Sequence, residues 1–118
     1  MPESMREMEG PFLLDSKIID LKVTLAKPGN YYLGEYRDRT FYVLYVGSDH
    51  VNVKIRLKQH IGEPCPYFMF RYASSPKDAY VFESQKYHDF GGERGNLLNK
   101  IHPAKPDGSD WKCPVCGK

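Results

Sequence analysis

The sequence predicts a small α+β domain in which about three antiparallel strands form a central sheet and helices flank it. Three observations carry this prediction: two neighbouring runs of aromatic and β-branched residues, a further short aromatic run, and one strongly capped helix. The chain has 118 residues, of which 41% are hydrophobic, so we expect one domain with a modest core. We place this domain at 17–103, after a poorly ordered segment at 1–16 and before a tail at 104–118.

The predicted strands follow from the spacing of the apolar residues. Apolar side chains at every second position favour a strand over 17–26. Residues 31–36 and 40–46 are aromatic or β-branched runs on either side of the charged tripeptide 37–39, a pattern typical of a β-hairpin. A last aromatic run at 67–72 favours one further strand.

The clearest helix is predicted over 76–90. Ser75 is a good N-cap, and Pro76 suits the first helical position because that position needs no N–H donor. Gly91 and Gly92 then provide the left-handed conformation that commonly ends a helix.

The segment 51–61 is ambiguous. Its apolar residues alternate with polar ones, which is a strand pattern. A helix is the alternative, because Asn52 can serve as its N-cap, and Val53 and Leu57 would then share one face. Local pattern alone favours the strand.

Two groups of polar residues are candidates for chemistry. Glu83 falls on the apolar arc of the predicted helix, where a carboxylate is costly unless it is paired or binds a metal. On helical position alone, a carboxylate bonded to a tyrosine or lysine at the edge of the arc is the favoured explanation. Arg56 and His60 lie four residues apart and would share a helix face that could bind a phosphate, or simply a solvated basic face.

Taken together, these residues resemble the motifs of the GIY-YIG nuclease superfamily. The order that carries the resemblance is Gly29-Asn30-Tyr31, Tyr45-Val46-Gly47, Arg56 with His60, Glu83 and Asn99. The resemblance covers 28–103, about two-thirds of the chain, and implies that 51–61 forms a helix. It also implies a divalent-metal-dependent endonuclease that hydrolyses phosphodiester bonds in nucleic acid, with DNA as the expected substrate.

The resemblance further implies a role for each residue. Glu83 would hold Mg²⁺ or Mn²⁺, and Arg56 would stabilise the negative charge that grows on the phosphate. Tyr31 or Tyr45 would orient or deprotonate the attacking water. Asn99 would steady the site, and His60 would hold a phosphate or a tyrosine hydroxyl.

A second motif stands near the end of the sequence. Cys113-Pro114-Val115-Cys116-Gly117 has the spacing of half a zinc knuckle, and zinc needs four ligands. We expect Cys65, a histidine or a second chain to complete the site. The alternative is a reduced cysteine pair without metal.

Charge and hydropathy bound the partners. The net charge is only +2, so nucleic-acid binding must come from a local patch. We expect no membrane association, because no apolar run approaches the roughly 20 residues of a span. The absence of a signal-like start and the odd number of cysteines suggest a cytoplasmic protein.

Two other functions remain open. The same scaffold could be a non-catalytic module that binds nucleic acid or protein with a structural zinc. The chain could also be an aromatic-rich α+β domain with accidental motif matches. The oligomeric state is not predicted.

Overall fold

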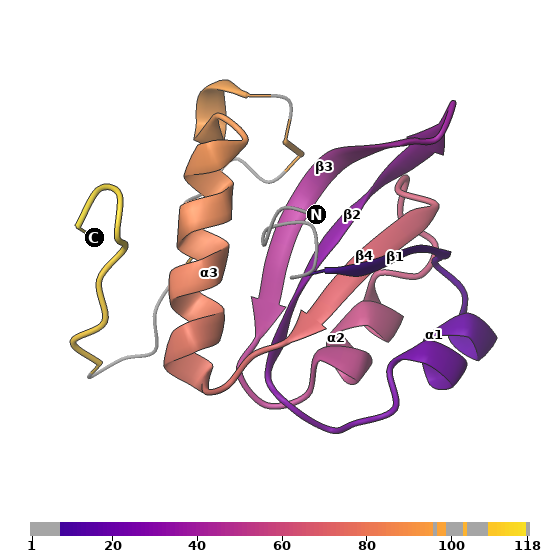
Figure 1. Cartoon of the computed structure of the whole chain (residues 1–118), viewed down its shortest axis with the longest axis horizontal. Helices are drawn as coiled ribbons and strands as arrows, with labels where there is room; N and C mark the ends of the chain where they lie inside the picture. Colours follow the sequence, from indigo (N-terminus) through magenta and orange to yellow (C-terminus); the bar gives the residue numbers. More distant parts are fainter. Residues whose placement is uncertain (1–7, 96, 99–102, 104–108, 118) are drawn as a thin grey trace.

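The computed structural model describes residues 8–95, 97–98, 103 and 109–117. Within these residues the protein is a small α+β domain with a four-stranded antiparallel sheet and three α-helices (Figure 1). The elements are β1 (Glu9–Leu13), α1 (Ser16–Lys22), β2 (Gly29–Arg37), β3 (Thr40–Asp49), α2 (Val53–Gln59), β4 (Tyr67–Tyr72), α3 (Pro76–Asp89) and a short 3₁₀ turn, η2 (Gly92–Arg94). The strand order across the sheet is β1-β4-β2-β3.

The predicted hairpin of β2 and β3 forms the centre of the fold. Asp38 and Arg39 make its two-residue turn with positive φ angles of 51° and 64°, a conformation that matches the twist of the flanking strands. Strand β2 pairs with β3 on one side and β4 on the other, and residues 29–34 are buried. The register places Tyr31 opposite Gly47, so the motifs Gly29-Asn30-Tyr31 and Tyr45-Val46-Gly47 meet across the hairpin.

The sheet is covered on both faces (Figure 1). Helices α1 and α2 pack on one face over a core of Ile19, Val23, Tyr31, Leu33, Val53, Leu57, Cys65, Phe68 and Phe70. Helix α3 packs on the other face, where the core consists of Met8, Tyr32, Val46, Tyr87 and Leu97. Because successive side chains of a strand point to opposite faces, Tyr31 and Tyr32 enter different cores.

The strand predicted over 17–26 is wrong, because residues 16–22 form helix α1. The Asp15 carboxylate caps this helix by accepting hydrogen bonds from the backbone N–H groups of Lys17 and Ile18. Ile19 and Val23, four residues apart, are fully buried, whereas Leu21 is 66% exposed. The apolar residues therefore follow the helical period, and the alternation was coincidental.

The ambiguous segment 51–61 resolves in the same way. Asn52 caps α2 by accepting hydrogen bonds from the N–H groups of Lys54 and Ile55. Val53 and Leu57 are fully buried, while Ile55 is 56% exposed. The helix implied by the resemblance is confirmed, and the strand favoured by local pattern is not.

The N-terminal expectation also needs correction. Residues 9–13 of the segment predicted to be poorly ordered form β1, an edge strand that pairs with β4 through Phe12 and Phe68. Pro11 fits there because an edge strand needs no hydrogen bond from every residue. The sheet therefore has four strands rather than about three. Residues 1–7 lie outside the described residues.

Candidate functional site

An open pocket of about 470 Å³ lies where β3 ends, α2 begins and α3 passes beside β3. Its lining residues are Tyr45, Ser48, Asp49, His50, Val51, Arg56 and Glu83. Three of the residues singled out from the sequence, Tyr45, Arg56 and Glu83, therefore share one pocket although they come from three different elements. Sequence reasoning did not place Ser48, Asp49 or His50 in this pocket, and their only signal for it is their position directly after Tyr45-Val46-Gly47.

Glu83 enters the pocket from α3. Its Oε1 accepts a hydrogen bond of 2.6 Å from the hydroxyl of Ser48 at the end of β3. Ala79 and Tyr87, one helical turn to either side, are buried, so the carboxylate lies at the edge of the apolar face as expected. The contact fixes the direction of the carboxylate and places a hydroxyl oxygen beside a carboxylate oxygen.

Arg56 reaches the pocket from α2, and its side chain is 46% exposed. Its Nε lies 3.4 Å from Oδ1 of Asp49. The other oxygen of Asp49 accepts hydrogen bonds from the backbone N–H groups of Val51 and Asn52 at 3.0 and 2.6 Å. Asp49 thus fixes the loop between β3 and α2 and also holds one edge of the guanidinium.

Tyr31 and His60 lie behind the pocket rather than in it. Tyr31 is 2% exposed, and its hydroxyl lies 2.8 Å from Nε2 of His60. The Nδ1 atom of the same ring is 2.9 Å from a carboxylate oxygen of Glu63. Because an ionised carboxylate only accepts hydrogen bonds, a neutral His60 carries its proton on Nδ1, and Nε2 then accepts from Tyr31.

Burial raises the pKa of Tyr31 well above its usual range, and the neighbouring Tyr45 and Glu83 add to the effect. The hydroxyl therefore stays protonated and can donate to His60. Burial, together with the negative charges of Glu83 and Glu63, also raises the pKa of the half-buried Tyr45. The positive charge of Arg56 lowers both pKa values, but both stay raised, so neither phenol is a base at neutral pH.

The motif glycines explain how the tyrosines fit. The rings of Tyr31 and Tyr45 are stacked, with centroids 6.2 Å apart and an interplanar angle of 5°. A Cβ atom at Gly47 would overlap the phenol ring of Tyr31. A Cβ atom at Gly29 would overlap the backbone carbonyl of Arg71 in β4. Both positions therefore need glycine for close approach, not for an unusual backbone angle.

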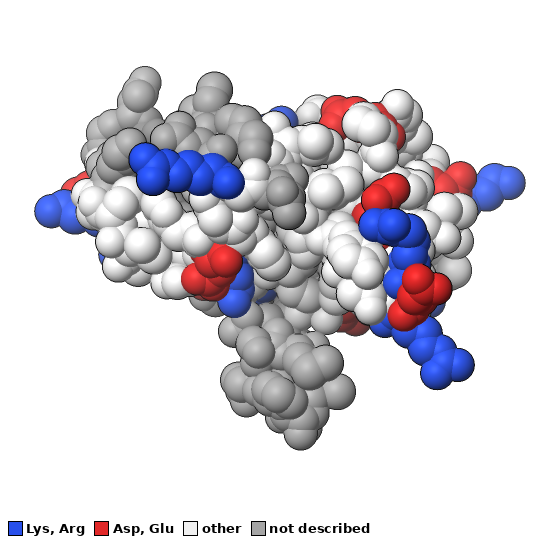
Figure 2. All heavy atoms as spheres, turned by 90° about the horizontal axis from the view of Figure 1, so that it is seen from above, with Lys and Arg blue, Asp and Glu red and all other residues white. Residues whose placement is uncertain are grey.

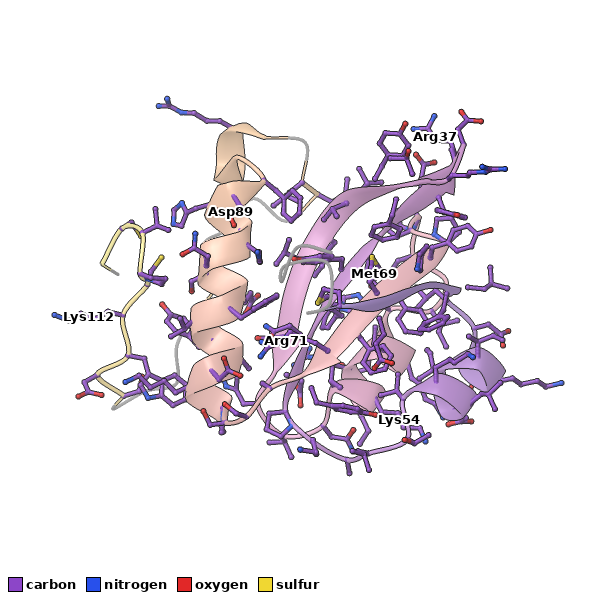
Figure 3. The ribbon with its side chains drawn as sticks, in the orientation of Figure 1. Arg37, Lys54, Met69, Arg71, Asp89 and Lys112 are labelled. Atoms are coloured by element: carbon purple, nitrogen blue, oxygen red, sulfur yellow. The ribbon has the colours of Figure 1, made fainter. Side chains whose placement is uncertain are left out.

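Asn30, between the two residues of the first motif, has a structural role that sequence reasoning missed. Its buried amide donates to the carbonyl of Ala79 in α3, and its oxygen accepts from Arg71, both at 2.8 Å. Arg71 also pairs with Asp78 at 2.8 Å and lies between the sheet and α3 (Figure 3). Burial would raise the pKa of Asp78, but hydrogen bonds from Ser74 and Arg71 lower it below its usual value.

A second site lies on the opposite side of α3. The sulfur atoms of Cys113 and Cys116 and a ring nitrogen of His88 all lie within 4.8 Å of one another, so these residues could hold a metal ion. No other group of three His, Cys, Asp or Glu side chains among the described residues comes this close. All four histidines of the chain were candidate ligands, and nothing in their spacing singled out His88.

The prediction that Cys65 contributes to this site is wrong. Cys65 is 2% exposed and packs in the core beneath α1 and α2. Burial raises the pKa of its thiol, which disfavours the thiolate that a metal requires. Asn99, predicted to steady the pocket, lies outside the described residues, so that prediction stays untested.

The described surface carries charged side chains of both signs. On the face drawn in Figure 2, the described basic and acidic side chains are interspersed, without a continuous patch of one sign. No helix among the described residues is long and apolar enough to cross a membrane. Comparison of the chain with known protein families, with curated proteins and with solved structures gives no match.

Proposed function

We propose that the protein is a divalent-metal-dependent endonuclease of the GIY-YIG type that hydrolyses phosphodiester bonds, with DNA as the expected substrate. The observation that carries this proposal is the convergence of Tyr45, Arg56 and Glu83 on one open pocket. These three side chains provide a hydroxyl, a cation that binds phosphate and a carboxylate, which are the groups that phosphodiester hydrolysis requires.

The donor atoms of the pocket fit a hard cation. Glu83 and Ser48 present a carboxylate and a hydroxyl in direct contact, and the Asp49 carboxylate lines the same pocket. Mg²⁺ or Mn²⁺ suits such a site, because Mg²⁺ is usually held by one or two carboxylates and keeps several waters. When bound, the cation would supply Lewis-acid polarisation of the phosphoryl group and stabilise the leaving oxygen.

Arg56 would bind the scissile phosphate. Its contact with Asp49 uses Nε, so the two terminal nitrogens remain for a phosphate, and half of the side chain is exposed. Guanidinium groups bind phosphate oxygens through two parallel N–H donors. In this position Arg56 would stabilise the charge that develops as the phosphoryl group reacts.

The two tyrosines would have different roles. Tyr45 lines the pocket and can contact a water, whereas Tyr31 is almost completely buried. Tyr45 would therefore orient the attacking water, because burial and the nearby carboxylates keep its pKa raised although the positive charge of Arg56 lowers it. Tyr31 and His60 would position Tyr45 through the stacked rings and the hydrogen bond behind them.

The metal group of His88, Cys113 and Cys116 would hold a different ion. Two sulfurs and one imidazole nitrogen bind zinc more favourably than they bind magnesium. The proposal therefore includes Zn²⁺ at this group, with a structural role. Among the residues that the structure describes, no fourth ligand comes together with these three.

A cleavage assay tests the proposal. The wild-type protein is incubated with a panel of single-stranded, duplex and branched DNA and RNA, with Mg²⁺ or Mn²⁺, and with a chelator as control. We expect cleavage that requires the added cation and is strongest on a DNA substrate. Measurable binding without cleavage of any substrate would contradict the nuclease and favour the non-catalytic binding module.

A further inference from the structure

One face of α3 is turned away from the pocket and covered by the C-terminal segment, residues 109–117. Tyr80, Ser84 and His88 lie four residues apart and therefore share this face. Tyr80 is 1% exposed and Ser84 is fully buried. Figure 1 shows the C-terminal segment along the side of α3 that is turned away from the sheet.

The C-terminal segment contacts α3 at two points. Near its start, the ring of Trp111 packs against Tyr80 with centroids 6.0 Å apart. Near its end, Cys113 and Cys116 meet His88 in the metal group. Between these points Lys112 points away from α3 into solvent (Figure 3).

The C-terminal segment is only partly buried. Cys113 is 3% exposed, but Val115 is 52% exposed and Cys116 is also exposed. Ordering the chain costs conformational entropy at each residue, and burial of apolar side chains must offset that cost. A metal that links the two cysteines to His88 would supply further binding energy.

The local backbone is already suited to a metal. The N–H group of Val115 donates to the sulfur of Cys113 at 3.4 Å, and the N–H group of Gly117 donates to the carbonyl of Cys113 at 3.0 Å. Gly117 closes this turn with a φ angle of +79°. A backbone N–H directed at sulfur favours the thiolate, which is the form that binds a metal.

Trp111 connects the metal group to the pocket. The indole ring makes an edge contact with His50, with centroids 5.7 Å apart and an interplanar angle of 80°. His50 in turn lines the pocket together with Arg56 and Glu83. The position of the C-terminal segment therefore determines whether Trp111 packs behind His50 in the pocket wall.

We propose that a zinc ion held by His88, Cys113 and Cys116 fastens the C-terminal segment to α3 and, through the contact between Trp111 and His50, fixes the wall of the pocket. Metal loading at α3 then controls substrate affinity at a site to which the metal is not bound. The effect on substrate rests on the proposed nuclease function, whereas the fastening of the segment does not.

Spectroscopy tests the fastening without any substrate. Trp111 is the single tryptophan of the chain, so tryptophan emission reports on the surroundings of this residue alone. Protein stripped of metal is titrated with Co²⁺, whose thiolate absorption identifies cysteine ligands. We expect this absorption in the wild type and in Cys65→Ala, the matched control with a thiol outside the group, but not in Cys116→Ser.

Tryptophan emission and its quenching by acrylamide are then compared with and without Zn²⁺. We expect Trp111 to become more accessible when the metal is removed, and Cys116→Ser to resemble the metal-free wild type. The imidazole NMR signal of His50, assigned with His50→Gln, should shift under the same conditions. Absence of cobalt–thiolate absorption in the wild type, or an unchanged Trp111 environment after metal removal, would overturn the proposal.

Affinity for a mixed-sequence single-stranded DNA oligonucleotide tests the connection to the pocket. Metal removal should weaken binding about fivefold or more, and Trp111→Ala should weaken it similarly while it keeps the cobalt absorption. Unchanged affinity in both cases would overturn the control of the pocket. A wild type that binds no oligonucleotide would overturn the proposed function and this control together, while the spectroscopic result still decides the fastening.

Discussion

Tyr31 and Cys113 are both almost completely buried, at 2% and 3% exposure, but different interactions bury them. Tyr31 stands in β2, an inner strand of the sheet, with its ring against Gly47, and belongs to a core of nine buried residues. Cys113 stands in an irregular segment beside one helix, near two other side chains that could bind a metal with it. The pocket is therefore built by packing that exists without an ion, whereas we propose that the C-terminal segment depends on one.

Two glycine substitutions, one in each region, should differ most in their effect on the free energy of unfolding. Gly47→Ala places a methyl group inside the ring of Tyr31, so we expect a loss of about 3 kcal/mol in the free energy of unfolding and loss of cleavage. Gly117→Ala meets no atom within 4 Å and strains only a left-handed backbone, at a cost of about 1 kcal/mol. Denaturant titration measures both, and equal losses would contradict the contrast.

Arg56→Ala tests the pocket without disturbing its packing. Removal of a group that binds the transition-state charge should lower the cleavage rate by roughly a hundredfold, on the order of 3 kcal/mol. Lys58→Ala is the matched control, because Lys58 lies on the same helix and pairs with Asp20 rather than with the pocket. Both variants should keep the wild-type unfolding transition, and an equal rate loss in both would indicate only a general effect of basic charge.

Tyr31→Phe has a smaller effect with a characteristic pH dependence. Loss of the hydroxyl removes the hydrogen bond to His60, which should cost about 1 kcal/mol at neutral pH. In the wild type the raised pKa of Tyr31 stabilises the folded state below the reference pKa of about 10, and this contribution is lost as the pH rises further. The unfolding free energy of Tyr31→Phe should therefore fall less steeply above that pH, and parallel curves would contradict the burial argument.

Two short helices show what the sequence could predict of the fold. Segments 17–26 and 51–61 have the same alternation of apolar residues. The alternation predicted a strand for 17–26, whereas the resemblance implied a helix for 51–61. In both, a capping side chain decides: Asp15 before α1 and Asn52 before α2. Alternation cannot distinguish the two structures in segments this short, because a pair of apolar residues four apart satisfies both patterns.

The pocket was predictable only in part. Tyr45, Arg56 and Glu83 carry unusual chemistry in a recognisable order, so the sequence could indicate them. Asp49 could not be found in this way, because its contacts with Arg56 and with two backbone N–H groups depend on how the chain turns after β3. His88 likewise could be distinguished from the other candidate histidines only when the C-terminal segment was placed beside α3.

The most direct test of the nuclease pocket is the ratio of cleavage rates between the wild type and Glu83→Gln at saturating Mg²⁺. Glutamine keeps the size of the side chain and can still bond to Ser48, but it lacks the charge that a hard cation requires. Glu35→Gln is the control, because Glu35 pairs with Arg37 near the hairpin turn, outside the pocket. We expect a rate loss on the order of a thousandfold for Glu83→Gln, with an unchanged unfolding transition, and wild-type cleavage by Glu35→Gln. Cleavage at the wild-type rate by folded Glu83→Gln would show that this carboxylate does not hold the cation and that the pocket is not the active site we propose.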